Sequence, residues 1–190
     1  MAGEFTVGKR LKGMPTSQMI QALRIIQGAM AAGVVVFAGV VLYLSYVVFG
    51  PSTSEPSTGD RLVDLLSMVN AVLACVCVIL AWLVGRIPLR RFTPPAELDP
   101  IAEVPEDSPV FAEFVAALFP ARLVRLAMLE GAGLFGLVVC LLAGLCGVVR
   151  ARPAYLFNML PAGLMVAYSV VTFPTRQLLR DMLRDRITHR

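Results

Sequence analysis

Four apolar runs dominate this sequence, and each is long enough to cross a lipid bilayer as a helix. They cover residues 25–49, 65–85, 126–149 and 154–173. A helix of about 20 residues crosses a hydrocarbon core of about 30 Å. Hydrophobic residues make up 57% of the 190-residue chain and charged residues only 16%, which is too few for a water-soluble domain of this length. We therefore predict an all-α polytopic membrane protein with four transmembrane helices in a bundle.

With their flanking residues, the predicted spans form one transmembrane domain of residues 20–173. The spans lie at about 20–49, 62–86, 121–149 and 153–173, with a cytoplasmic segment 1–19 before them, a cytoplasmic loop 87–120 between the second and third, and a cytoplasmic tail 174–190 after them. The first run follows basic residues, as the apolar core of a signal peptide does, but it is longer than the roughly 7–15 residues of such a core. We expect it to be an uncleaved span.

Lysine and arginine gather on one side of the predicted membrane. Of the 17 basic residues, only Arg61, Arg150 and Arg152 fall on the other side. Because cytoplasmic loops carry the excess of basic residues, we expect both termini to be cytoplasmic and the protein to lie in the inner membrane. A basic rim that faces anionic lipid accounts for the net charge of +4 without a nucleic-acid partner.

Two segments outside the spans have apolar residues at helical spacing. At 109–119 we expect a short amphipathic helix on the cytoplasmic membrane surface, because Ser108 suits a helix cap, Pro109 suits the first position and Pro120 suits the end. In the tail 174–190, leucines form one face and arginines another. That pattern fits an interfacial helix beside anionic headgroups, and periodicity does not separate it from a helix that docks on a cytoplasmic partner.

Small residues recur every four positions on the first and third predicted spans. They are Gly28 and Ala32, with Ala29 and Gly33 beside them, on the first span, and Ala132, Gly136, Cys140 and Gly144 on the third. Lipid tails provide no hydrophobic drive for helix association, so small residues that let backbones approach closely mark helix interfaces. We therefore expect the first and third spans to touch through these residues.

The same two spans also begin with a similar motif. Gln27–Gly33 reads QGAMAAG and Glu130–Gly136 reads EGAGLFG, while IPLRRF and FPTRQL follow the second and fourth spans. These matches favour a duplicated helical hairpin, and parallel repeats of this kind occur in transport proteins. Convergent small-residue packing explains the matches equally well, because glycine and alanine are common in membrane helices.

Glu130 stands at the edge of the long apolar stretch between Arg125 and Val149. The segment EGAGLFGLVVCLLAG, Glu130–Gly144, resembles the carboxylate helix of the rotor-ring proteolipids, the c subunits of rotary ATP synthases. The resemblance covers only this short segment. It implies that Glu130 carries a translocated proton or sodium ion and that Gly136 is a packing position.

The depth of Glu130 favours a different role. It lies four residues inside Leu126, or about 6 Å below the cytoplasmic edge, whereas the carboxylate of the proteolipids lies near mid-membrane. The polar residues expected at a similar depth are Arg24, Gln27, Arg86 and Arg125. Because a carboxylate near the interface costs little when it pairs with arginine, we expect an ion pair that fixes helix packing, with Gln27 as a hydrogen-bond partner. An ion relay and a ligand or partner contact are the alternatives.

The other polar groups fit structural roles. Asn70 and Asn158 both fall near the outer ends of their spans, where they could meet, and buried amides usually join helices in membrane bundles. The four cysteines lack the spacing of metal ligands, and the sequence contains no nucleophile–base set, phosphate-binding loop or dinucleotide motif. We predict no metal, no cofactor and no enzymatic activity.

These observations lead to two hypotheses about function. The first is a non-enzymatic structural or accessory subunit of the inner membrane, in a homo-oligomer or with other membrane subunits. The alternative is a proton- or cation-translocating, proteolipid-like protein that uses Glu130.

Overall fold

The computed structural model describes residues 15–48, 58–91, 105 and 108–188, without the side chains at 58–60, 85–91, 150–151 and 186. Every element in these ranges is a helix. The elements are α2 (Thr16–Tyr43), the π-helical turn η1 (Leu44–Val48), α3 (Thr58–Arg91), α4 (Pro109–Leu145), α5 (Val148–Ala151), the 3-10 helix η2 (Pro153–Met159), α6 (Leu160–Val171) and α7 (Arg176–Thr188). Most of the predicted N-terminal segment, the first loop and the acidic part of the middle loop lie outside the described residues.

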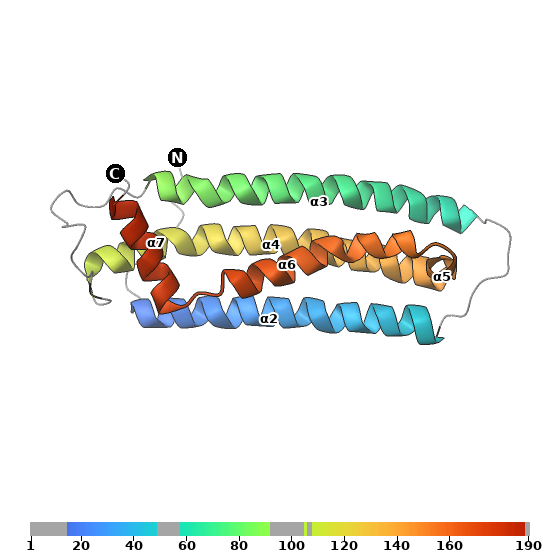
Figure 1. The fold of residues 1–190 in the computed structure, drawn as a ribbon, viewed down its shortest axis with the longest axis horizontal. Helices are drawn as coiled ribbons and strands as arrows, with labels where there is room; N and C mark the ends of the chain where they lie inside the picture. The colour runs from blue at the N-terminus through green and yellow to red at the C-terminus, as the bar shows by residue number, and fades with distance from the viewer. Residues whose placement is uncertain (1–14, 49–57, 92–104, 106–107, 189–190) are drawn as a thin grey trace, which may run out of the picture.

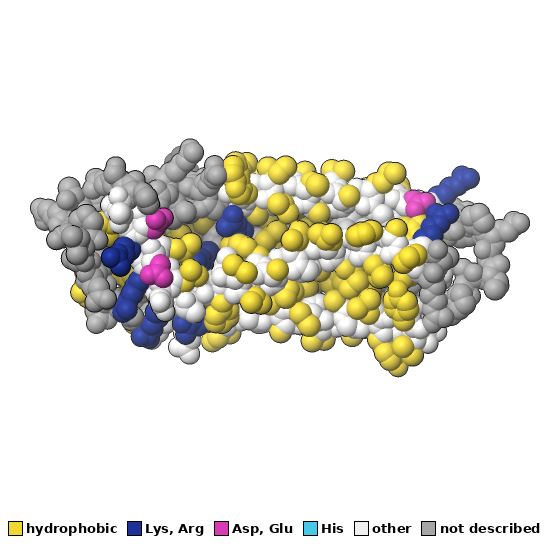
Figure 2. Space-filling view, viewed as in Figure 1, with side chains coloured by type: hydrophobic (Ala, Val, Ile, Leu, Met, Phe, Trp, Pro, Cys, Tyr) yellow, Lys and Arg dark blue, Asp and Glu magenta, His cyan; other side chains and the backbone are white. Residues whose placement is uncertain are grey.

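Four helical segments are long and apolar enough to span a membrane, as predicted. They are Thr16–Val48, Arg61–Val84, Pro109–Leu145 and Pro153–Val171. α2 begins and α7 ends at the same end of the bundle, which we call the inner end; the opposite end is the outer end (Figure 1). On the face shown in Figure 2, apolar side chains surround the middle of the bundle and charged side chains lie toward its two ends. The all-α class and the four span-forming helices are confirmed.

The central helix is α4. It packs against α2, α3 and α6 along its length, and against α7 and the short elements near its ends, while α2 and α3 lie on opposite flanks of the bundle (Figure 1). The buried core in the middle of the bundle consists of Val34, Val41, Ala81, Leu126, Leu129, Leu137, Cys140, Ala162 and Met165. At about 1.5 Å per residue, the 37 residues of α4 extend over about 55 Å, well beyond a hydrocarbon core.

The segment 109–119 does not form a separate surface helix, which corrects the sequence-based expectation. It is the first part of α4, which continues through Pro120 to Leu145. The predicted cap is present, because the Ser108 hydroxyl accepts a hydrogen bond of 3.2 Å from the backbone N–H of Phe111. Pro120 removes one backbone donor, and burial of Phe114 and Leu118 on the same helix offsets that loss.

The apolar face of α7 packs on the protein itself. Leu179 and Leu183 are buried at the inner end of the bundle, in a cluster that also contains Met19, Ile20, Phe111, Phe114, Val115 and Leu118. Figure 1 shows α7 lying across the inner ends of the longer helices. The tail forms a helix whose Leu179 and Leu183 pack on the start of α2 and the first part of α4, while Met182 of the same face remains exposed. The interfacial helix and the helix that docks on a partner both stay predictions.

The fourth span begins as a 3-10 helix and continues as an α-helix. Pro161 lies in the first turn of α6, where a missing N–H is tolerated. On the outer side, Gly147 adopts a left-handed conformation with φ of 70° and ends the turn between α4 and α5. The change of helix type therefore coincides with Pro161.

The small residues of α4 are buried, but their contacts differ from those expected. Ala132, Gly136, Cys140 and Gly144 are all buried, and of the two glycines Gly144 lies against the first span, at Ser45. Gly136 lies directly against the backbone carbonyl of Asn158 in η2.

The small residues of α2 are not part of this interface, which is a second correction. Gly28, Ala29, Ala32 and Gly33 are exposed, and a Cβ atom added at either glycine would meet nothing within 4 Å. α2 contacts α4 and α6 instead through larger side chains such as Val34 and Val41, because its buried face lies about a third of a turn or more from the glycines.

Gly136→Ala should destabilise the bundle strongly, because the added Cβ would overlap the carbonyl oxygen of Asn158. We expect a loss of about 2 kcal/mol or more in the free energy of unfolding. Gly131→Ala on the same helix is the matched control, since a Cβ there meets nothing within 4 Å and alanine favours helix. Thermal unfolding in detergent measures both variants, and equal melting temperatures would contradict the close approach.

Candidate functional site

The polar side chains of the bundle form two groups at its opposite ends. The outer polar ladder joins α3 to η2 through Asp64, Ser67, Asn70, Arg152, Tyr155 and Asn158. The inner polar cluster surrounds the end of α6 with Arg24, Gln27, Arg122 and Arg125.

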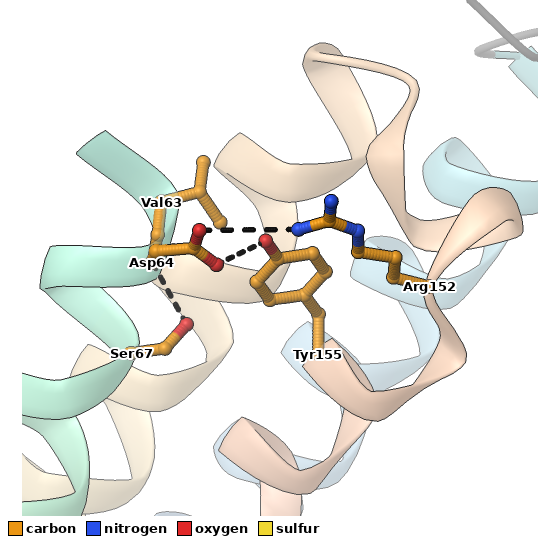
Figure 3. Close-up of polar contacts among 5 residues, drawn as sticks. All are labelled: Val63, Asp64, Ser67, Arg152 and Tyr155. Atoms are coloured by element: carbon orange, nitrogen blue, oxygen red, sulfur yellow. Dashed lines mark hydrogen bonds and ion pairs between the residues drawn. The ribbon is translucent and has the colours of Figure 1, made fainter. Parts of the chain in front are cut away.

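The outermost contacts of the ladder centre on Asp64 (Figure 3). Its carboxylate accepts a hydrogen bond from the Tyr155 hydroxyl and lies 3.9 Å from Nη1 of Arg152. Tyr155 is buried, whereas the Asp64 and Arg152 side chains are about half exposed. An exposed ion pair of this kind contributes little to stability, so the buried tyrosine is the more important anchor of this end.

The ladder continues inward through the amides that were predicted to meet. Nδ2 of Asn70 donates to Oδ1 of Asn158 at 3.0 Å, and Nδ2 of Asn158 donates to the Ser67 hydroxyl at 2.9 Å. Both asparagines are buried. The predicted contact between Asn70 and Asn158 is confirmed, and it ties α3 to the fourth span beneath the ion pair.

The polar residues of the ladder have the same three-residue spacing on α3 and along η2. Asp64, Ser67 and Asn70 recur every three residues on α3, and so do Arg152, Tyr155 and Asn158 in and beside η2. In a 3-10 helix, residues three apart lie directly above one another. The 3-10 form of η2 therefore places its polar residues in one row that faces α3.

The inner polar cluster caps the C-terminal end of α6. Nε2 of Gln27 donates to the carbonyl of Ser169 at 2.7 Å, and Nη1 of Arg122 donates to the carbonyl of Thr172 at 3.3 Å. Nε of Arg24 donates to the carbonyl of Pro174 at 2.8 Å. The last carbonyls of a helix lack partners within it and carry partial negative charge, so arginine and amide donors stabilise this end.

Arg125 completes the cluster through an aromatic side chain. Its Nη1 donates to the Tyr168 hydroxyl at 3.2 Å, and the guanidinium lies 5.1 Å from the centre of the tyrosine ring. Arg122 is buried and Arg125 is half-buried, and the two are three residues apart on one face of α4. Sequence reasoning counted Arg122 only as a cytoplasmic positive charge; its spacing from Arg125 was the available signal for a shared site.

The expected partners of Glu130 bind elsewhere. Gln27 contacts α6, Arg24 contacts the segment after α6, and Arg125 contacts Tyr168. The side chain of Arg86 lies outside the described residues. Glu130 itself is half-buried, and within the part of the chain that the structure describes it has neither an ion pair nor a hydrogen bond. The expected pairing with Arg24, Arg125 or Gln27 is therefore not present.

An apolar layer separates the two polar groups. Asn158 of the ladder and Ser169 of the cluster are about 16 Å apart along the fourth span. Between these levels the described buried side chains are apolar, among them Leu129, Ala132, Leu137, Ala162 and Met165. The two groups therefore act as separate hydrogen-bonded attachments between helices.

Comparison with known proteins found no family model that matches the sequence, no curated protein that matches it and no solved structure that matches the fold.

The contact between Asn70 and Asn158 should be measurable as a coupling energy. Single substitutions to alanine should each destabilise the protein, and the double variant should lose less than their sum, with a coupling of about 0.5–2 kcal/mol. The control combines Asn158→Ala with Cys75→Ala, because Cys75 is an exposed position on α3, the helix that carries Asn70. The losses of stability of these two variants should be additive. Unfolding in detergent supplies all the values, and additivity of the two asparagine variants would refute the contact.

Proposed function

We propose that this protein is a non-enzymatic structural subunit of an inner-membrane assembly, formed with a second copy of the same chain or with another membrane subunit. The observation that carries the proposal is the unoccupied small-residue face of α2, made of Gly28, Ala29, Ala32 and Gly33. Small residues in membrane helices are used where another helix backbone approaches closely. Within the described residues, nothing in the same chain uses this face.

The exposed sides of α2 and α3 support the same proposal. α2 and α3 lie at the two sides of the bundle, and each buries only one face against α4 and its neighbours (Figure 1). Large apolar residues such as Val36 and Val72 remain exposed, each by 66%. Of the two flanks, α2 alone combines this exposure with glycine–alanine pairs at four-residue spacing, Gly28 with Ala32 and Ala29 with Gly33, so we assign the contact to α2.

A second copy is the partner that we favour. A parallel pair of α2 helices related by a two-fold axis would place Gly28 and Ala32 of one chain against the same residues of the other. Both chains would then have the same orientation, with the basic inner end on the cytoplasmic side, as the distribution of lysine and arginine favours.

Ion translocation by Glu130 is the second candidate function. It is favoured by one observation: a half-buried carboxylate in an apolar span that has no counter-ion among the described residues. Such carboxylates are by default suspected of function. The apolar layer in the bundle argues for the structural role instead, because a path for ions through one chain would have to cross it.

Gly33→Leu should reduce self-association without disturbing the bundle, because the added side chain projects from the exposed face of α2 into open space. Gly163→Leu on α6 is the matched control, since a Cβ there also meets nothing within 4 Å. We expect chemical crosslinking in liposomes to show mostly monomer for Gly33→Leu and an unchanged oligomer for Gly163→Leu. If both variants crosslink like the native chain, α2 is not the interface.

Glu130→Gln should leave ion flux unchanged at the background level, since the structural proposal requires no ion path. Proton and sodium flux into proteoliposomes measures this directly, with empty liposomes as the control. Flux above that control in the native chain, lost in Glu130→Gln, would establish the second candidate function instead.

A further inference from the structure

Three arginines meet at the inner end of α6 with most of their donors available. Each guanidinium carries five N–H donors, yet the described contacts of Arg24 and of Arg125 use one donor each. Arg122 uses two, one to the carbonyl of Thr172 and one to the sulfur of Met182. The site can therefore bind several more acceptor oxygens.

The positive charge of these arginines is not balanced by the residues around them. Among the described residues, none of these three arginines forms an ion pair. The C-terminal end of α6 supplies a partial charge of only about −0.5. Three cations thus lie around the end of α6 and the segment after it, and an anion would complete the site.

Exposed apolar side chains lie next in sequence to two of the arginines and in the last turn of α6. Ile25 follows Arg24 and is 63% exposed, Val124 precedes Arg125 and is 47% exposed, and Val171 in the last turn of α6 is 78% exposed. A soluble anion has no apolar part that could cover these side chains. A phospholipid has both parts, because its phosphate carries the negative charge and its acyl chains cover apolar side chains at the adjoining depth.

We propose that Arg24, Arg122 and Arg125 bind the phosphate of an anionic phospholipid in the leaflet at the inner end of the bundle. Arg125 and Arg24, which are half-buried, contact the phosphate oxygens, and the buried Arg122 supports them electrostatically. The Tyr168 hydroxyl, which accepts from Arg125, has its own proton to donate to the phosphate. Anionic lipids are abundant in the cytoplasmic leaflet, which suits this depth and charge. Arg24 and Ile25 lie one turn before Gly28 and Ala29 on α2, so this site borders the proposed assembly face, whereas Arg125 lies on α4.

The test compares lipid binding by the full chain and its variants in detergent, with phosphatidylglycerol, phosphatidylcholine and inorganic phosphate as probes. Arg125→Gln should weaken phosphatidylglycerol binding about fivefold and leave phosphatidylcholine binding unchanged. Arg125→Lys, which keeps the charge, should recover most of the loss. Arg184→Gln on α7 is the matched control, because it removes the same charge from an exposed position outside the site.

Three results would overturn the proposal. Equal losses in Arg125→Gln and Arg184→Gln would show that only overall charge matters. Equal weakening of both lipids in Arg125→Gln would show a purely structural arginine. Binding of inorganic phosphate as tight as that of phosphatidylglycerol would show a site for a soluble anion.

Discussion

The direct approach of other elements to the glycines of α4 sets the geometry of the whole bundle. Gly133 faces α6, where a Cβ atom would lie 3.0 Å from the Cα of Ala162, while Gly136 faces η2 and Gly144 faces η1. Each glycine removes a side chain at the point where a different neighbour crosses. Lipid tails are as apolar as the side chains of the spans, so moving a side chain from lipid into the bundle gains no hydrophobic free energy. Close packing is therefore the main source of association between the spans. The ladder and the inner cluster then fix the two ends.

The parts of the fold that depend on the chemistry of a single segment were predictable from the sequence. The length and apolar character of the spans, the helix cap at Ser108 and the amphipathic pattern of α7 are local properties of this kind. The contact between Asn70 and Asn158 was also predictable, because two amides at equal depth on neighbouring spans satisfy each other better than lipid does.

The choice of neighbours was not predictable, and the reason is physical. Membrane lipid and protein interior are both apolar, so residue type does not say whether Gly33 on α2 or Gly136 on α4 meets another helix. Pro120 was read as a helix end because proline weakens helices locally, but packing of α4 against α2 and α7 continues on its inner side. Arg122 and Tyr155 were missed as polar contacts because their partners are distant in sequence.

The 3-10 form of η2 also affects how the length of the fourth span matches the thickness of the bilayer. A 3-10 helix rises about 2.0 Å per residue and an α-helix about 1.5 Å, so the seven residues of η2 lengthen this span by about 3.5 Å. Rewinding η2 into an α-helix would shorten the span and turn Tyr155 and Asn158 away from their common row. Bilayer thickness and the α3–η2 hydrogen bonds are therefore mechanically linked: a thinner membrane favours the shorter form, and the hydrogen bonds oppose it.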